Sequence, residues 1–196
     1  MLIAALVVLA VLTVPLTGGR WSHLAAFRPR GSWLLWLSLG IQVLQFTFLD
    51  LGRASDAVHV GTYLLAAAFV FANRHVAGVW LVALGGFANG LTITLNGGTL
   101  PARAEALRAA GLPVDRDDFV NSGVLAHAKL PWLGDVFAVP KGIPLANVFS
   151  VGDVLLVIGA FVVVHGLARR APQVADGTAA AGDAPESADA AKSATA

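Results

Sequence analysis

The chain has 196 residues, of which 57% are hydrophobic and 13% are charged, and its mean hydropathy is +0.74. A soluble domain carries roughly 25% charged residues, so this composition favours a membrane protein. The net charge of +1 gives no reason to expect nucleic-acid binding, and the lack of cysteine excludes disulfides, thiolate metal sites and cysteine nucleophiles.

Five apolar runs follow one another along the chain. They comprise residues 2–16, 33–49, 57–72, 76–95 and 151–168. Each is near the roughly 20 residues that a transmembrane helix needs, although the first is short. No basic residue precedes the first run and no A-x-A-like site closes it, which argues against a signal peptide. The sequence therefore predicts an all-α integral membrane bundle of about five transmembrane helices.

Positive charges predict the orientation of this bundle. Arginines follow the first, third and fifth runs, which all end on the same side of the membrane. Because positively charged flanks stay in the cytoplasm, we expect a cell-membrane protein with its N-terminus outside and its C-terminus inside. Residues 1–170 then form the transmembrane domain, and residues from about 96 to 150 form a long outer loop that carries short helices.

The last segment has a different composition. Residues 171–196 are mainly Ala, Gly, Asp, Ser and Pro, with almost no large apolar side chain. Such a segment cannot bury enough surface to offset the entropy lost on ordering. We expect a disordered cytoplasmic tail.

Polar residues gather where the fourth run ends and the fifth begins. Pro101 suits the first turn of a short helix that would end at Gly111. Ser150 and Asp153 match a capping box at the start of the fifth helix, which explains Asp153 without a catalytic role. We expect the outer loop to fold back and bring its histidine and acid to this region. The candidate polar site consists of Asn89, Asn96, Gly97, Gly98, Pro101, His127, Asp135, Ser150 and Asp153.

Acidic residues in the same loop raise the question of a metal. Asp115, Asp117 and Asp118 precede His127 and Asp135. Their spacing matches no known metal-site pattern, and clustered acids of this kind are typical of a solvated turn. We therefore predict no metal and no cofactor.

Several motifs point to a family. NGGTLP at 96–101, HAKLPWLGD at 127–135 and FSVGD at 149–153 look like the signatures NGG-x-[ML]-P and FS-[IV]-GD, with Leu100 where Met is expected. Together with Gly18–Leu24, they resemble an uncharacterised bacterial multi-pass membrane family that carries a domain-of-unknown-function label. The resemblance covers about residues 1–170. It implies membrane placement, and it implies that the motif residues around the outer loop act as one unit.

Three functions stay open from the sequence. The first is binding, or helping to transport, a small polar ligand, an ion or a lipid headgroup at the outer face. The second is an intramembrane enzyme that uses His127 as a base, oriented by Asp135 or Asp153. The third is a structural or accessory subunit whose outer loop is a packing cap. The expected partners are the lipid bilayer and either a second copy or another membrane protein, with no nucleic acid.

Overall fold

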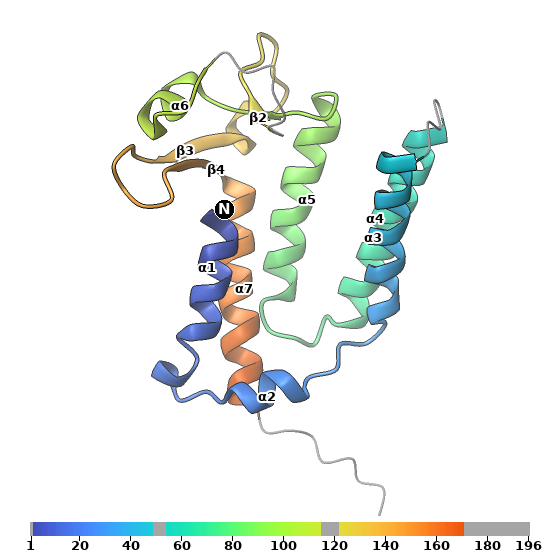
Figure 1. Ribbon diagram of the computed structural model, residues 1–196. Coiled ribbons are helices and arrows are strands. Elements are labelled where there is room, and N and C mark those ends of the chain that lie inside the picture. Colours follow the sequence, from blue (N-terminus) through green and yellow to red (C-terminus); the bar gives the residue numbers. More distant parts are fainter. Residues whose placement is uncertain (1, 49–53, 115–121, 171–196) are drawn as a thin grey trace, which may run out of the picture.

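The computed structural model describes residues 2–48, 54–114 and 122–170 (Figure 1). Its α-helices are α1 (Leu2–Leu12), α2 (Trp21–Ala26), α3 (Ser32–Phe48), α4 (Ala54–Ala72), α5 (Val79–Leu95), α6 (Ala104–Ala110) and α7 (Val151–Arg169). The other described elements are two 3-10 turns, η1 (Pro15–Thr17) and η2 (Pro131–Leu133), and the strands β1 (Leu100–Pro101), β2 (Ser122–Gly123), β3 (Asp135–Val139) and β4 (Asn147–Ser150). The predicted tail lies outside the described residues.

The predicted bundle of five transmembrane helices is wrong. Within the described ranges, α7 is the one helix that is long and apolar enough to cross a membrane, with 19 residues and a mean hydropathy of 2.2. The helix α1 has 11 residues and α5 has 17. Among the residues of α3 and α4 whose side chains are described, the apolar stretches are Ser32–Ile41 and Gly61–Ala72. All of these are shorter than the roughly 20 residues that a full span requires.

Local backbone chemistry explains why two helices are shorter than the runs that predicted them. The first run stops at Leu12 because Pro15 lacks the N–H that a continuing α-helix needs, and a 3-10 turn follows instead. The helix α5 starts three residues after the beginning of the fourth apolar run. Gly78 has a φ of 87°, outside the right-handed helical region, so the helix cannot extend through it toward the N-terminus. The hydrophobicity of the sequence alone does not predict either of these helix boundaries.

The all-α class is also wrong, because the predicted outer loop contains strands. The strands β1 and β2 pair in parallel, and β3 and β4 form an antiparallel hairpin in which Phe137 opposes Phe149. The two phenyl rings stack with their centroids 5.3 Å apart. Alternating aromatic and β-branched residues favour strands, and Pro140 and Pro144 lie in the connection between them. The predicted short helix exists as α6 and ends at a left-handed Gly111 as expected, but its predicted start is wrong, because Pro101 lies in β1 and the helix begins at Ala104.

Figure 1 shows α1, α5 and α7 side by side, with α3 and α4 paired beyond α5. The α5–α7 contact is made without side chains at its closest points. A Cβ added to Gly85 would lie 2.5 Å from the carbonyl oxygen of Gly152 and 2.8 Å from the amide nitrogen of Leu156. Lower down, a Cβ on Gly159 would lie 2.6 Å from the amide nitrogen of Val82. The two backbones can approach this closely only because glycine occupies these positions.

The N-terminal helix packs on the last one. Ala10, Val14 and Ala168 are fully buried where α1 and η1 meet the end of α7. The His165 ring lies between two hydroxyls, with Nε2 3.2 Å from Thr13 Oγ1 and Nδ1 2.8 Å from Thr17 Oγ1. The first and last helices of the described chain are therefore held together by both packing and hydrogen bonds.

The helices α3 and α4 form a separate pair. The Ser38 hydroxyl donates to the Thr62 carbonyl across the pair at 3.1 Å. The chain segments at one end of the pair are joined by Asn73, which follows α4. Its side chain accepts from the N–H of Arg30, just before α3, at 2.9 Å and donates to the Arg30 carbonyl at 2.8 Å. One amide side chain thus satisfies both backbone groups of a residue 43 positions earlier.

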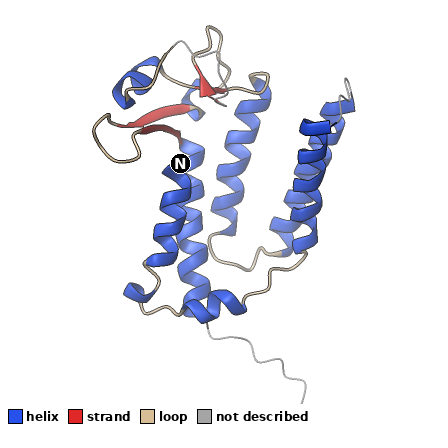
Figure 2. Ribbon diagram, in the orientation of Figure 1, coloured by secondary structure: helices blue, strands red, loops and turns tan. Residues whose placement is uncertain are grey.

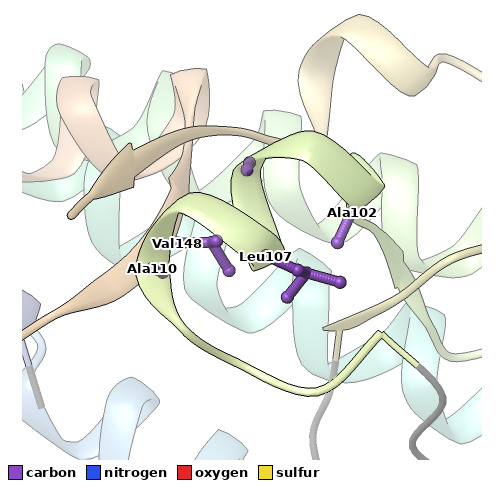
Figure 3. Packing of buried hydrophobic residues seen from close by; sticks show 5 residues of the cluster. Ala102, Leu107, Ala110 and Val148 are labelled. Atoms are coloured by element: carbon purple, nitrogen blue, oxygen red, sulfur yellow. The ribbon is translucent and has the colours of Figure 1, made fainter. Parts of the chain in front are cut away.

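Residues 100–114 and 122–150 form a small cap at one end of the helices (Figure 2). Its core joins α6 to the hairpin, as Figure 3 shows. The buried members of this core are Ala102, Ala106, Leu107, Ala110 and Val148. The Lys141 N–H donates to the Ala109 carbonyl at 2.8 Å and secures the hairpin connection. The segment predicted to be an outer loop is therefore a packed α/β unit.

We expect Gly85→Ala to lower the free energy of unfolding by about 1–2 kcal/mol, because the new methyl group must separate α5 from α7. Gly86→Ala is the matched control. A Cβ on Gly86 meets nothing within 4 Å, so the better helix propensity of alanine should raise stability by about 0.5–1 kcal/mol. Thermal unfolding followed by circular dichroism compares them. Equal effects of the two changes would contradict the close crossing.

Candidate functional site

Three of the predicted site residues form one hydrogen-bonded cluster where α5 faces the start of α7. Asn89 Nδ2 donates to Asp153 Oδ1 at 2.8 Å, and the Ser150 hydroxyl donates to Asn89 Oδ1 at 2.8 Å. The Ser150 N–H donates to Asp153 Oδ2 at 3.0 Å, and the Asp153 N–H donates to Ser150 Oγ at 3.0 Å. The predicted capping box is therefore confirmed, and Asn89 extends it to a second helix. We call Asn89, Ser150 and Asp153 the polar clasp.

A glycine that the sequence analysis missed makes the clasp possible. A Cβ on Gly152 would collide with Asn89 Oδ1 and would lie 2.8 Å from the Gly85 carbonyl oxygen. Glycine at position 152 lets the Asn89 amide reach between the two helices to the carboxylate. The available signal was a set of small residues recurring in both apolar runs, which favours close helix approach.

Asn96 fastens the end of α5 to the cap. Its Nδ2 donates to the Thr92 and Lys129 carbonyls, both at 2.8 Å, and its Oδ1 accepts from the Lys129 N–H at 2.8 Å. The turn that follows consists of Gly97 and Gly98, with φ of 64° and 97°. These values lie in the left-handed region that glycine adopts at no steric cost. Asn96 therefore holds the loop backbone at Lys129, and Gly97 and Gly98 turn the chain into β1.

Asp135 is the most buried of the predicted site residues that carry a charge, with 3% of its surface exposed. It begins β3, where it pairs with Ser150, and its carbonyl accepts from the Arg103 N–H at 3.0 Å. The pKa of Asp135 is raised from 3.8 to about 6. Burial is the largest cause, a hydrogen bond from the Ser122 side chain lowers the pKa, and the charge of Asp153 raises it again. This carboxyl therefore titrates near neutral pH.

Pro101 lies against the turn that leads into Asp135. A Cβ on Gly134 would collide with the Pro101 carbonyl oxygen, so the two backbones are in direct contact. The bridge between Ala102 and Asp135 continues this contact. Asp135 is thus fixed from three sides: by β4, by the chain after Pro101 and by Ser122. Ser122 was not predicted, because nothing in its sequence neighbourhood marks it as a partner of a carboxyl 13 positions later.

His127 stands apart from the predicted residues that cluster. It is exposed in a turn of the cap, and no hydrogen bond joins its ring to another described residue. Asp135 is buried, and both carboxylate oxygens of Asp153 accept hydrogen bonds from the clasp. The described contacts therefore do not assemble His127 with either acid into an acid–base pair. Asp115, Asp117 and Asp118 lie outside the described residues.

These features define a mostly helical protein in which a small α/β cap is fastened to the ends of two tightly crossed helices. A protein-family model described as a family of unknown function (DUF5317) matches residues 27–165. This match covers more than half of the chain, so the chain belongs to that family. The expectation of a family of unknown function is confirmed, while the motif signatures and the membrane placement stay predictions.

One curated relative adds to this comparison. A protein of Thermotoga maritima, named as an uncharacterised protein, is 30% identical over 103 residues. The aligned part is 52% of this chain, and it spans about 58% of the length of the relative. No solved structure matches the chain.

The raised pKa of Asp135 predicts a pH dependence of stability. An acid whose folded-state pKa exceeds its unfolded value favours the folded state most below the unfolded pKa. That contribution is lost as the pH rises through the folded pKa. Between about pH 4 and pH 6 the free energy of unfolding of the wild type should therefore fall by on the order of 2–3 kcal/mol relative to that of Asp135→Asn. Melting temperatures of both proteins from pH 4 to pH 7 measure the difference, and parallel curves would contradict the shift.

Proposed function

We propose that this chain is a membrane-spanning structural or accessory protein, in which α7 crosses the bilayer and carries the cap at the outer surface. The length of α7 supports this, because 19 residues span roughly 28 Å, close to the hydrocarbon thickness of a bilayer. The exposure of α7 also supports the proposal, since only 17% of its apolar 18-residue stretch is buried inside the protein. A core helix of a soluble protein would be mostly buried.

Exposed apolar side chains on neighbouring helices also support a lipid environment. Leu16, Trp36, Leu64 and Phe87 are 83%, 71%, 67% and 65% exposed. These four residues belong to η1, α3, α4 and α5. Soluble monomers rarely expose large contiguous apolar surface, because it promotes association in water. In a bilayer the same side chains face lipid tails.

The distribution of arginines supports an orientation. Arg20, Arg74 and Arg170 lie at the end opposite the cap, where the Arg170 guanidinium donates to the His75 carbonyl at 3.4 Å. Because positively charged flanks remain in the cytoplasm, this end is the inner one. The helix α7 then runs from the outer surface, where it carries the cap, to the inner surface.

The clasp is the observation that carries the structural role. Every side-chain polar atom of Asn89, Ser150 and Asp153 has a partner within the cluster. A ligand site keeps donors or acceptors available for its ligand, and these three residues instead satisfy one another. Ser150 is buried and Asn89 and Asp153 are half-buried, and polar groups satisfied in this way fix one arrangement of the elements that carry them.

A second candidate function is binding of a small polar ligand at the cap, and Asp135 favours it. Its carboxylate is buried at a cost to stability at neutral pH, and such a cost is often associated with a functional group. A cationic group, such as a small amine, would compensate the buried negative charge. The enzyme hypothesis gains no comparable support from the contacts of His127.

The structural role predicts that Ser150→Ala lowers the free energy of unfolding by about 1–2 kcal/mol, because it removes the helix cap and the bond to Asn89. Asn89→Ala should act through the same cluster. The double variant should therefore differ from the sum of the single changes by at least about 0.5 kcal/mol. Ser22→Ala, an exposed serine on α2, is the control and should be neutral. If the clasp residues serve a ligand alone, the single variants will unfold like the wild type.

Membrane orientation is tested with single cysteines, since the natural chain has none. Ala109 on α6 and Ala25 on α2 are exposed alanines at opposite ends of the molecule. A membrane-impermeant thiol reagent on intact cells should label Ala109→Cys and leave Ala25→Cys unlabelled until the cells are lysed. Both proteins should stay in the membrane pellet after an alkaline carbonate wash. Release by that wash would contradict membrane spanning, and the reverse labelling would contradict the orientation.

A further inference from the structure

The end of the molecule opposite the cap concentrates exposed positive charge. We call it the basic end, and its members are Arg20, Arg28, Arg30, Arg74, Arg169 and Arg170. They come from three segments: the α1–α3 connection, the α4–α5 connection and the last turn of α7. The fold therefore assembles one basic surface from positions distributed over 150 residues of sequence.

Hydrogen bonds to backbone groups hold these three segments together. The Arg20 N–H donates to the Ala168 carbonyl at 2.9 Å, and Arg169 Nε donates to the Thr17 carbonyl at 3.2 Å. Asn73 binds the backbone of Arg30 through two hydrogen bonds. The relative positions of the arginine backbones are thus fixed by the protein and do not depend on a ligand.

The charge of the basic end has no acidic counterpart among the described residues. The described acids are Asp56, Glu105, Asp135 and Asp153, and each belongs to the cap or to the start of α4 or α7, away from the basic end. The guanidinium groups that do have partners use backbone carbonyls, as Arg28 does with Ala25 at 2.7 Å. Carbonyls leave the net charge in place. The acids that follow Arg170 lie outside the described residues.

A short helix marks the depth of this surface. The helix α2 runs across the lower ends of the longer helices, at the level of the basic end (Figure 1). Its Trp21 is 53% exposed and donates its indole N–H to the Val11 carbonyl at 2.8 Å. Exposed tryptophan next to arginine is typical of the headgroup region, where the ring is partly apolar and phosphate is available.

We propose that the basic end binds the phosphate groups of anionic phospholipids in the inner leaflet. The inference rests on the membrane placement proposed above. The basic end selects the lipid by its charge. The occupant is therefore a phosphatidylglycerol-type headgroup, and a zwitterionic lipid does not replace it. Clustered arginines at the cytoplasmic surface attract such lipids, and their fixed backbones reduce the ordering cost of binding.

The test uses the full chain purified in a non-ionic detergent and titrated with phosphatidylglycerol, phosphatidylcholine or inorganic phosphate. Phosphatidylglycerol should raise the melting temperature by about 2–4 °C, and the other two should not. In Arg20→Gln/Arg30→Gln, the lipid concentration at half-effect should rise roughly 25-fold, from about five-fold per positive charge at an anionic surface. These two side chains make no hydrogen bond to another described residue, so the variant should unfold like the wild type in detergent alone.

The control is Arg103→Gln/Arg108→Gln, which removes the same charge from two exposed arginines of the cap. It should respond to phosphatidylglycerol like the wild type. An equal loss in the control variant, an equal response to phosphatidylcholine, or full reproduction of the effect by inorganic phosphate would each overturn the proposal. Failure of membrane placement is detected separately by the carbonate wash, so a protein that stays in the pellet but ignores lipid charge refutes only the lipid site.

Discussion

The close crossing of α5 and α7 is the constraint on which the other features depend. Gly85 and Gly152 allow the backbones of α5 and α7 to come into contact. The short separation of the two helices decides which groups a polar side chain one turn away can reach. Asn89 reaches the first turn of α7 because no side chain separates the two helices. With larger residues at the crossing, its amide would face the carboxylate of Asp153 across an apolar gap, and both groups would lose a partner.

The cap depends indirectly on the close crossing of α5 and α7. Its last strand, β4, continues directly into α7 through Ser150, so the residue that caps the helix also pairs with Asp135 in the sheet. Asn96 attaches the other end of the cap by binding the backbone at Lys129. The two asparagines lie two turns apart on α5, and each connects that helix to a different segment. Helix packing, helix capping and strand pairing are therefore coupled through a few amide and hydroxyl groups.

Much of the local structure could be predicted from the sequence. The apolar runs located the long helices, and the patterns around Gly111 and Ser150 gave the ends of α6 and α7, because such signals lie within a few residues of one another. The lengths of α1 and α5 could not be predicted from hydrophobicity, since Pro15 and Gly78 act through backbone geometry. The strands were missed because each is short and is stabilised by a partner elsewhere in the cap. The burial of Asp135 depends on Ser122 and β4, so it follows from tertiary contacts that no local pattern contains.

The packing of α1 on α7 has a consequence for how the chain is made. Thr13 and Thr17 are synthesised well before His165, which belongs to the last described helix. Contacts across some 150 residues carry a high loop-closure entropy, and they cannot form before α7 has been synthesised. Until then α1 has no α7 to cover its buried face at Ala10 and Val14, whereas the α3–α4 pair can already associate through local contacts. Of these described helices, α1 is therefore made before α3 and α4 but packs into the fold after they have paired.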